Sequence, residues 1–511
     1  METLEVPIGI VAIVDESPVQ DTESIEELFE PAWKAENYGN TPDCSPSEAK
    51  REYPYVQFSD AGNGARLVAE YGDFVRYVND ERGWRIYDGV RWTADKTGEI
   101  TRLALKTIRG IMVRAAETDK LELREKLAKW SLSCESRSRL ENMVALASRE
   151  QKVSTNSVSF DVSPWLLNCA NGTIDLEAKT FRPARREDLL SKRSPVAYDP
   201  NARCPRFDAF LAEILPSEEI RRFLQTSLGY TLCGHAWEKY VWFLIGGGDN
   251  GKTVLIETIR YVFGEDDYAT NMNFNSLLHR EGQGPSGDIA RLRGARFVSA
   301  CESDQGQKIS PALLKRLSGG GDKITASYKY RDEFEFVPTH KLWLATNHAP
   351  QLAAEDDALW RRIARVPFNV RIPLEQQDER LQEKLKAEGP GILNWLFDGW
   401  KTYLDGGLKL PAEVQEETDR YRDASDVVKD FLQDCVVPGS GDIGSTRLYQ
   451  AYKGWFADTH NQRQQPMSQK MFSMRLEQLG HPIEKKRDGN VFSGIGRLVG
   501  DEPPTSDGLF E

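Results

Sequence analysis

Residues 240–263 read YVWFLIGGGDNGKTVLIETIRYVF, and three kinds of sequence follow one another in this stretch. The continuous apolar run at 240–245 is typical of a strand that is buried on both faces. Residues 246–253 match the pattern G-x-x-x-x-G-K-[ST], and the residues after them predict a helix. A strand, a glycine-rich loop and a helix in this order predict a phosphate-binding P-loop. We therefore expect an α/β domain that binds ATP or a related nucleotide, since a chance glycine-rich turn would lack these flanking elements.

The residues of the P-loop have different roles. Glycines let backbone N–H groups surround the phosphates, and the N-terminus of the following helix adds a favourable dipole. Lys252 is expected to reach the β- and γ-phosphates, while the hydroxyl of Thr253 is expected to bind Mg²⁺. The expected contacts to the nucleotide come from Gly246, Gly247, Gly248, Asp249, Asn250, Gly251, Lys252 and Thr253.

Two further apolar runs end in polar residues and extend this predicted site. Residues 295–301 predict a strand that is followed by Glu302 and Asp304. Carboxylates at such a strand end can hold the Mg²⁺ shell and polarise the attacking water, and we expect Glu302 to contact the metal. Residues 341–346 predict a third strand, followed by Asn347, whose amide can orient water against the γ-phosphate. A solvated strand end or a turn is the alternative at both positions.

Adjacent arginines, Arg361 and Arg362, precede a fourth strand-like run, residues 363–368, which contains a proline. In ring-shaped ATPases, an arginine supplied to the site of a neighbouring subunit stabilises charge in the transition state. Ordinary surface ion pairing is the alternative for both residues.

The net charge of −13 is unevenly distributed along the chain. Residues 1–50 carry twelve acids and two lysines, so the other 461 residues share a net charge of only −3. Residues 101–150 and 441–500 each carry a net charge of +4. A local basic face suits binding to nucleic-acid phosphates, although an ordinary solvated surface would give the same counts.

The C-terminal region has a helical pattern that ends in a basic hairpin. Short helices are expected at 426–432, 445–457 and 468–479, followed by strands around Asp488-Gly489. Three helices and a hairpin in this order predict a winged helix, which binds DNA in many proteins and docks other proteins in some. The cations expected to contact DNA are Lys470 and Arg475 on the last helix and Lys485, Lys486 and Arg487 on the wing.

Composition and periodicity divide the chain into modules around the P-loop. The predicted fold is α/β, with an α+β domain before the ATPase core and a winged helix after it. The expected segments are an acidic disordered tail at 1–60, an α+β domain at 61–205, a helical linker at 206–239, the P-loop domain with a helical extension at 240–425, the winged helix at 426–500 and a tail at 501–511.

Cysteine spacing and hydropathy indicate where the protein works. The seven cysteines include no C-x-x-C pair, which argues against a zinc site and against a disulfide framework. The N-terminus has no signal-peptide pattern, and no run of about 18 apolar residues predicts a membrane span. We therefore expect a cytoplasmic protein without a membrane partner.

The motifs, taken in order, resemble the superfamily 3 helicase domain, and more closely the phage/plasmid and poxvirus primase–helicase family. The similarity covers roughly residues 60–500. The segments that carry it are the P-loop, Glu302, LSGGGDKITA at 317–326, LWLATN at 342–347, the arginine pair, LNCANGTIDL at 167–176 and YDPNARCP at 198–205.

The resemblance implies an AAA+ core, a hexameric ring and ATP-driven translocation on single-stranded DNA. By the same resemblance, Lys252 and Thr253 match the P-loop, Glu302 the second acidic motif, Asn347 the sensor and Arg362 the arginine finger.

The DNA-gripping hairpin of the family corresponds here to residues 324–336, in which apolar residues alternate. Lys329, Tyr330 and Arg331 at its tip are expected to meet backbone phosphates and bases without reading the base sequence. Many relatives have Arg where this chain has Ser327, so these three residues need not share the contacts in the usual way. Larger family members also carry an N-terminal primase domain, for which the acidic tail is too short, so a separate primase or polymerase is a candidate partner.

The sequence therefore predicts an ATP-hydrolysing replicative DNA helicase of a phage, plasmid or other mobile element, which unwinds forked DNA as a homo-oligomeric ring. Two alternatives stay open. An origin-binding or assembly protein switched by ATP would bind DNA without processive strand separation. A P-loop phosphotransferase would have a small-substrate pocket and turnover that does not need DNA.

Overall fold

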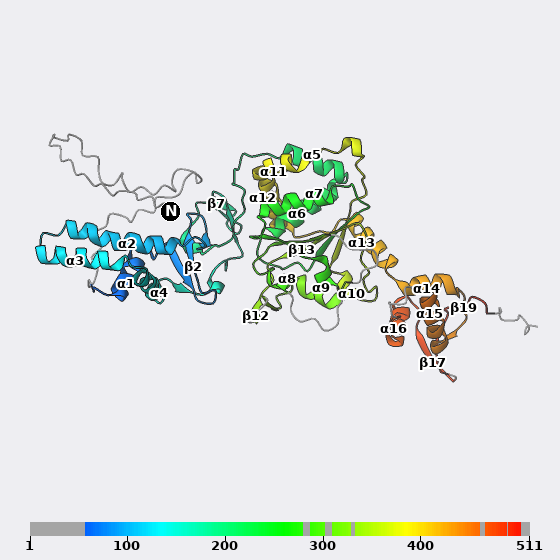
Figure 1. The fold of residues 1–511 in the computed structure, drawn as a ribbon. Helices are drawn as coiled ribbons and strands as arrows, with labels where there is room; N and C mark the ends of the chain where they lie inside the picture. Colours follow the sequence, from blue (N-terminus) through cyan, green and yellow to red (C-terminus); the bar gives the residue numbers. More distant parts are fainter. Residues whose placement is uncertain are drawn as a thin grey trace, which may run out of the picture. The chain divides into compact units, whose positions relative to one another are not determined.

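The computed structural model has a mixed α/β architecture, in agreement with the predicted fold class (Figure 1). The predicted acidic tail lies outside the described residues as far as residue 56, and the first helix begins already at Asp60. The structure describes residues 57–278, 287–301, 309–328, 333–459, 466–487 and 489–501.

The first module is a small sheet with four helices. Its strands lie in the order β3-β2-β1-β4, with β4 parallel to β1 and the other pairs antiparallel. A turn at Asp88-Gly89 joins β2 to β3, where the Asp88 carboxylate accepts from the backbone N–H groups of Val90 and Arg91. The elements are α1 (Asp60–Tyr71), β1 (Val75–Val78), β2 (Gly83–Tyr87), β3 (Trp92–Ala94), α2 (Glu99–Ala116), α3 (Leu121–Cys134), α4 (Arg137–Ala147) and β4 (Ser154–Thr155).

An antiparallel three-stranded sheet and two helices lead to the central sheet. A tight turn before Gly172 joins the first two of these strands, with Cys169 opposite Gly172. The elements are β5 (Leu166–Cys169), β6 (Gly172–Asp175), β7 (Thr180–Arg182), α5 (Pro205–Ile214) and α6 (Glu218–Thr231).

The central sheet has five parallel strands in the order β14-β8-β13-β10-β9. A two-stranded antiparallel hairpin, β11–β12, is inserted before β13. The elements are β8 (Val241–Ile245), α7 (Lys252–Phe263), β9 (Ala269–Asn271), α8 (Gly287–Ala290), β10 (Phe297–Cys301), α9 (Pro311–Leu317), β11 (Ile324–Ser327), β12 (Glu333–Phe336), β13 (Lys341–Thr346), α10 (Asp357–Trp360) and β14 (Ile363–Pro367).

Helices cover both faces of this sheet, so its strands are apolar on both sides. Alternate residues of β8 belong to different cores: Trp242 and Leu244 pack with α5, α6 and α7, whereas Val241 and Phe243 pack with residues of α8, α9 and α10. Figure 1 shows these two sets of helices on opposite sides of β13. Three later helices, α11 (Leu381–Ala387), α12 (Gly389–Gly406) and α13 (Ala412–Ala424), complete the domain.

The crossing of α6 and α12 is close because glycines lie at it. A Cβ atom on Gly229 would lie 2.2 Å from the backbone nitrogen of Trp400, and one on Gly399 would lie 2.1 Å from the carbonyl oxygen of Gln225. No other side chain fits either position without moving backbone.

The C-terminal module has its own apolar core, centred on Phe431, Tyr452 and Phe472. Three helices are followed by a hairpin, and a third strand completes a sheet in the order β16-β18-β17. The elements are α14 (Val427–Cys435), β15 (Val436–Val437), β16 (Ile443–Gly444), α15 (Ser445–Thr459), α16 (Gln469–Gln478), β17 (Ile483–Lys486), β18 (Gly489–Phe492) and β19 (Arg497–Leu498).

Candidate nucleotide-binding site

The carboxyl ends of three neighbouring strands bring the predicted site residues to one edge of the central sheet. Ile245 at the end of β8 is in register with Thr346 at the end of β13, and Ala345 is in register with Cys301 at the end of β10. The P-loop and Asn347 therefore start from adjacent strands. In parallel α/β sheets, ligands bind at the carboxyl ends of the strands.

The backbone of the P-loop turns through three left-handed residues before α7 begins at Lys252. The φ angles are 93° at Gly248, 50° at Asp249 and 78° at Gly251. Gly251 is also in contact with α5, because a Cβ there would lie 2.6 Å from the Cγ2 atom of Ile214. The loop conformation therefore depends on glycine at this position for both its φ angle and its packing.

Lys252 is buried, with 4% of its surface exposed, and its ammonium group is held by neutral oxygens. Its Nζ atom donates to the carbonyl of Gly246 at 2.8 Å, to Oδ1 of Asn250 at 2.7 Å and to Oδ1 of Asn347 at 3.2 Å. Burial lowers the pKa of Lys252 to about 8. No ion pair joins this lysine to a carboxylate among the residues that the structure describes, so its positive charge is available to an anion.

Asn250 links the lysine to the strand on the other side of the P-loop. This buried amide accepts from Lys252 through Oδ1 and donates through Nδ2 to the carbonyl of Phe368 at 3.1 Å. The sequence pattern treats this position as any residue, so its role in orienting the lysine could not be predicted from the motif.

Only part of the predicted metal and water-activating set is described. Thr253 is exposed on the first turn of α7, where its hydroxyl can meet a cation. Glu302 and Asp304 lie outside the described residues, and β10 ends one residue before them, at Cys301. Within the described ranges, no cluster of three His, Cys, Asp or Glu side chains is arranged to hold a metal ion.

The two predicted finger arginines have different surroundings. Arg362 donates to Ser318 Oγ at 2.7 Å and to the carbonyls of Lys315 and Gly319 at 3.2 and 3.5 Å. These groups lie at the C-terminal end of α9, where a cation is favoured by the helix dipole. The side chain of Arg361 is exposed and forms no ion pair with a described residue.

The predicted hairpin is formed by β11 and β12, with Ile324 opposite Phe336 and Ser327 opposite Glu333. Alternate residues of both strands turn inward, and Tyr328 continues that face by stacking on Phe334 at 5.5 Å. The tip residues Lys329, Tyr330 and Arg331, which are predicted to contact DNA, lie outside the described residues.

The C-terminal module corrects one predicted DNA contact. Arg475 on α16 is buried, and its guanidinium donates from Nε and Nη2 to Oδ2 of Asp426 at 2.9 and 2.6 Å. Since Asp426 also caps the N-terminus of α14, this arginine joins two helices and does not face solvent as predicted. Helical periodicity could not distinguish the two faces of α16, because its buried side carries a charge.

The other predicted cations of this module lie at the surface. Lys486 is paired with Asp442. Lys470, Lys485 and Arg487 are exposed and form no ion pair with any residue in the described ranges.

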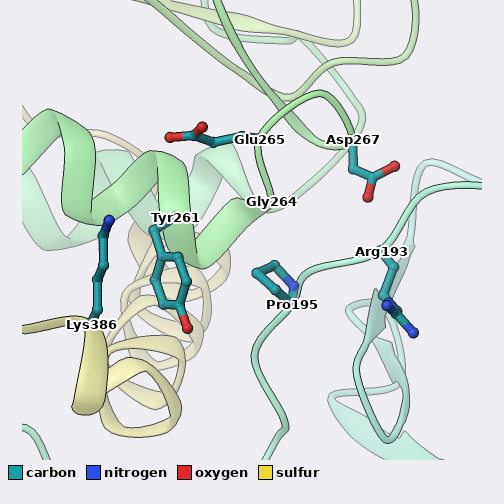
Figure 2. A pocket seen from close by; sticks show the side chains of 7 residues that line it. All are labelled: Arg193, Pro195, Tyr261, Gly264, Glu265, Asp267 and Lys386. Atoms are coloured by element: carbon teal, nitrogen blue, oxygen red, sulfur yellow. The ribbon is translucent and has the colours of Figure 1, made fainter. Parts of the chain in front are cut away.

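A separate pocket of about 320 Å³ lies at the far end of α7 from Lys252 (Figure 2). Acids and bases both line it, and the Nζ atom of Lys386 lies 5.5 Å from the ring centre of Tyr261. None of the predicted site residues contributes to this pocket. Its lining is Arg193, Pro195, Tyr261, Gly264, Glu265, Asp267 and Lys386.

Residues 64–216 match the family model described as D5 N terminal like. A second model, described as Family of unknown function (DUF5906), matches residues 244–362, which run from the P-loop to the arginine pair.

Viral proteins with helicase and primase names are similar to this chain. "Putative helicase L207/L206" of Acanthamoeba polyphaga mimivirus is 27% identical over 328 residues, which are 59% of this chain and 34% of that protein. "Putative helicase 184R" of Invertebrate iridescent virus 6 is 24% identical over 69% of this chain and 39% of its own length. "Putative primase C962R" of African swine fever virus is 22% identical over 58% of this chain and 34% of its own length. The match thus spans a little over a third of the curated relatives.

Among solved structures, the apo structure of the NrS-1 C terminal region has 11% sequence identity and a TM-score of 0.44, with 86% of this chain and 100% of that chain covered. None of the helices within the described ranges is both long enough and apolar enough to cross a membrane. The chain is therefore similar to viral proteins that carry helicase and primase names, and part of it matches the D5 N terminal like model.

Proposed function

We propose that this chain is an ATP-dependent replicative DNA helicase with an AAA+ core, encoded by a virus, phage, plasmid or related element. The observation that carries the proposal is the buried Lys252, held between Asn250 of the P-loop and Asn347 of the neighbouring strand. In a helicase, the structural change caused by ATP hydrolysis has to be transmitted from the nucleotide site to a second strand of the sheet. The strand β13 lies between β8 and β10 and continues directly from the β11–β12 hairpin, so it can link that hairpin to the nucleotide.

In the proposed reaction, ATP phosphates replace the neutral acceptors of Lys252. The ammonium would then contact the β- and γ-phosphates, and Asn347 would be released to orient the attacking water. Mg²⁺, when bound beside Thr253 and the acids after β10, would neutralise phosphate charge. The exposed hydroxyl of Thr253 fits that role, and Glu302 or Asp304 would polarise the water.

Arg361, rather than Arg362, is the better candidate for a finger that acts on a neighbouring subunit in a ring. The side chain of Arg362 already binds the C-terminal end of α9, and withdrawing it would leave that end without its hydrogen bonds. Arg361 is exposed and can enter another site without such a loss.

DNA would be contacted at two places. The tip of the β11–β12 hairpin would hold one strand, and the C-terminal module would act as a winged helix through Lys470, Lys485 and Arg487. These three cations have free charge at the surface of α16 and of the β17–β18 hairpin, which favours contact with phosphates.

Strand displacement on forked DNA of both polarities, with ATP and Mg²⁺, tests this proposal. The expected result is ATP-dependent separation of one polarity, absent in Lys252→Ala. ATP hydrolysis with DNA binding but no strand separation would reject the helicase and favour a protein whose assembly is switched by ATP. Turnover that is unaffected by DNA would favour a phosphotransferase.

A further inference from the structure

The chain segment directly after β14, residues 368–372, is hydrogen-bonded at its two ends to the end of β8 and to the P-loop. The N–H of Phe368 donates to the carbonyl of Ile245 at 3.0 Å, and Asn250 donates to the carbonyl of Phe368 at 3.1 Å. Four residues further on, the N–H of Ile372 donates to the carbonyl of Asp249 at 2.8 Å. The segment is therefore fixed to the loop at both ends, and residues within it keep a constant position relative to the expected phosphates.

Arg371 lies inside this fixed segment and points its charge at the tip of the P-loop. Its Nη2 atom is 3.4 Å from Oδ2 of Asp249. The arginine side chain is 81% exposed, and the aspartate side chain is 53% exposed. No other ion pair of Arg371 with a described residue occurs, so the guanidinium keeps most of its five N–H donors for a ligand.

Asp249 is an unexpected residue in a loop that binds phosphates. Its carboxylate is on the same loop as Lys252, and a triphosphate bound there would be repelled by it. Its left-handed backbone, with φ of 50°, is tolerated better by Asp and Asn than by most residues. Arg371 is a nearby cation that offsets the charge of Asp249, and it is positioned to meet a phosphate as a second anion.

We propose that Arg371 binds a phosphate oxygen of the nucleotide directly, in the same subunit as the P-loop, and that Asp249 holds its guanidinium at the loop before the nucleotide arrives. This inference rests on the proposed nucleotide site and adds a second cation to it beside Lys252. Because a guanidinium forms paired hydrogen bonds with phosphate oxygens, Arg371 increases affinity for the phosphates and not for the base.

The competing explanation is that Arg371 only neutralises Asp249. The two explanations differ when the aspartate is removed. If Arg371 binds phosphate, its removal still lowers ATP affinity in an Asp249→Asn background. If Arg371 is only a counterion for Asp249, its removal has no effect on ATP affinity there. Asn preserves the left-handed backbone at this position, so the comparison is made in a loop of unchanged conformation.

The test is calorimetric titration of ATP and ADP into the full chain, using wild type, Arg371→Ala, Asp249→Asn and the double variant. Arg371→Ala should weaken ATP binding by about 10- to 100-fold, as expected for a charge-assisted hydrogen bond. A loss of several-fold should likewise separate the double variant from Asp249→Asn, smaller than in the wild-type loop because Asp249 no longer holds the guanidinium. Equal ATP affinity of those two proteins would overturn the proposal and leave Arg371 as a counterion.

Two controls separate this inference from the proposed function. Arg380→Ala removes another exposed arginine, nine residues further along the chain, and should leave the affinity for ATP unchanged. An equal loss of affinity in this variant would show a general charge effect and overturn the proposal. Lys252→Ala should abolish binding. If it does and Arg371→Ala has no effect, only the role of Arg371 fails, whereas unchanged binding in Lys252→Ala rejects the nucleotide site itself.

Discussion

Lys252 in the P-loop domain and Arg475 in the C-terminal module are both buried cations at positions predicted to meet phosphate, yet their surroundings differ. The ammonium of Lys252 donates to two amide oxygens and one backbone carbonyl, all of them neutral. The guanidinium of Arg475 donates to the carboxylate of Asp426, whose exposed fraction is only 1%. The charge of Arg475 is balanced by a buried carboxylate, whereas Lys252 has no carboxylate partner among the residues that the structure describes.

This difference shows how a binding cation can be distinguished from a structural one. A buried charge without a counterion carries a desolvation cost that an arriving anion offsets, so binding is favoured. A cation in a buried ion pair does not favour ligand binding, because moving it to the ligand would leave the carboxylate buried without a counterion. The same criterion separates the exposed Lys470 from the paired Lys486 on the surface of the C-terminal module.

Removing Lys252 is the most severe test of this difference. Lys252→Ala should reduce ATP hydrolysis below detection, because loss of even one electrostatic group that stabilises a transition state costs about 10²- to 10³-fold and nucleotide binding is lost as well. Steady-state phosphate release with and without single-stranded DNA measures this. Lys401→Ala, which removes a surface lysine paired with Asp398, is the charge-matched control and should hydrolyse ATP normally.

The next test compares alanine variants of the two adjacent arginines, Arg361 and Arg362. Arg361→Ala should retain ATP binding and lose about 10³-fold in turnover, as reported for arginine fingers in general. Mixing it with Lys252→Ala should restore some activity at hybrid interfaces. Arg362→Ala should instead lower the free energy of unfolding by about 1–3 kcal/mol, because acceptors at the end of α9 lose their donor. Loss of turnover confined to Arg362→Ala would contradict the assignment.

Breaking the buried pair in the C-terminal module should destabilise that module alone. Arg475→Ala leaves the buried carboxylate of Asp426 without its counterion, which costs about 3–5 kcal/mol. Replacing Arg475 by Met and Asp426 by Leu together should recover only part of this, because the cap of α14 is lost as well. Hydrogen exchange of α15 in the full chain is the measurement. Arg447→Ala, which removes a surface pair with Asp501, should change protection by less than about 1 kcal/mol.

The lowered pKa of Lys252 predicts a pH dependence for nucleotide binding. Above pH of about 8 the free site loses its proton, whereas a bound phosphate favours the charged form, so binding takes up a proton and affinity falls as pH rises. Between about 8 and 10.5 the unfolded chain binds more protons at this lysine, so this group makes unfolding less favourable as pH increases. Calorimetry at pH 8.5 in buffers of different ionisation enthalpy should detect the uptake; equal apparent enthalpies would contradict it.

The smallest expected effect concerns the surface cations. Alanine at Lys470, Lys485 and Arg487 together should reduce the salt slope of single-stranded DNA binding by about 2, at roughly 0.7 for each phosphate contact. Lys486→Ala should leave the slope unchanged because that charge is paired with Asp442. A slope that falls equally in both variants would show that pairing does not decide which cations bind.

The P-loop motif predicted the strand, the loop and the helix of the site because each has a strong local signal. Apolar continuity identified β8 and β13, and the polar residues after them placed Asn347 beside Lys252 through the register of parallel strands. These are consequences of burial on both faces, which the sequence records directly.

Contacts between distant segments could not be predicted in this way. Arg475 and Asp426 are 49 residues apart in the sequence, and their pairing requires α14 and α16 to face each other. Nothing in the periodicity of either helix indicates this contact. The contact of Asn250 with Phe368, 118 residues further along the chain, depends likewise on the strand order of the sheet. Local patterns predict elements, while these polar contacts depend on how the elements are packed.

The close crossing of α6 and α12 has a consequence for any attempt to transplant the domain that contains the central sheet. The segment from 244 to 362 contains three complete strands of the central sheet, β9, β10 and β13, yet one face of that sheet is covered by helices that lie before and after it in the sequence. A fragment limited to residues 244–362 would expose the apolar side chains of that face to water, among them Leu244 and Trp343. The smallest fragment that keeps this face of the sheet covered therefore begins near Pro205 and ends after Gly406, because α6 and α12 have to accompany the strands that they pack against.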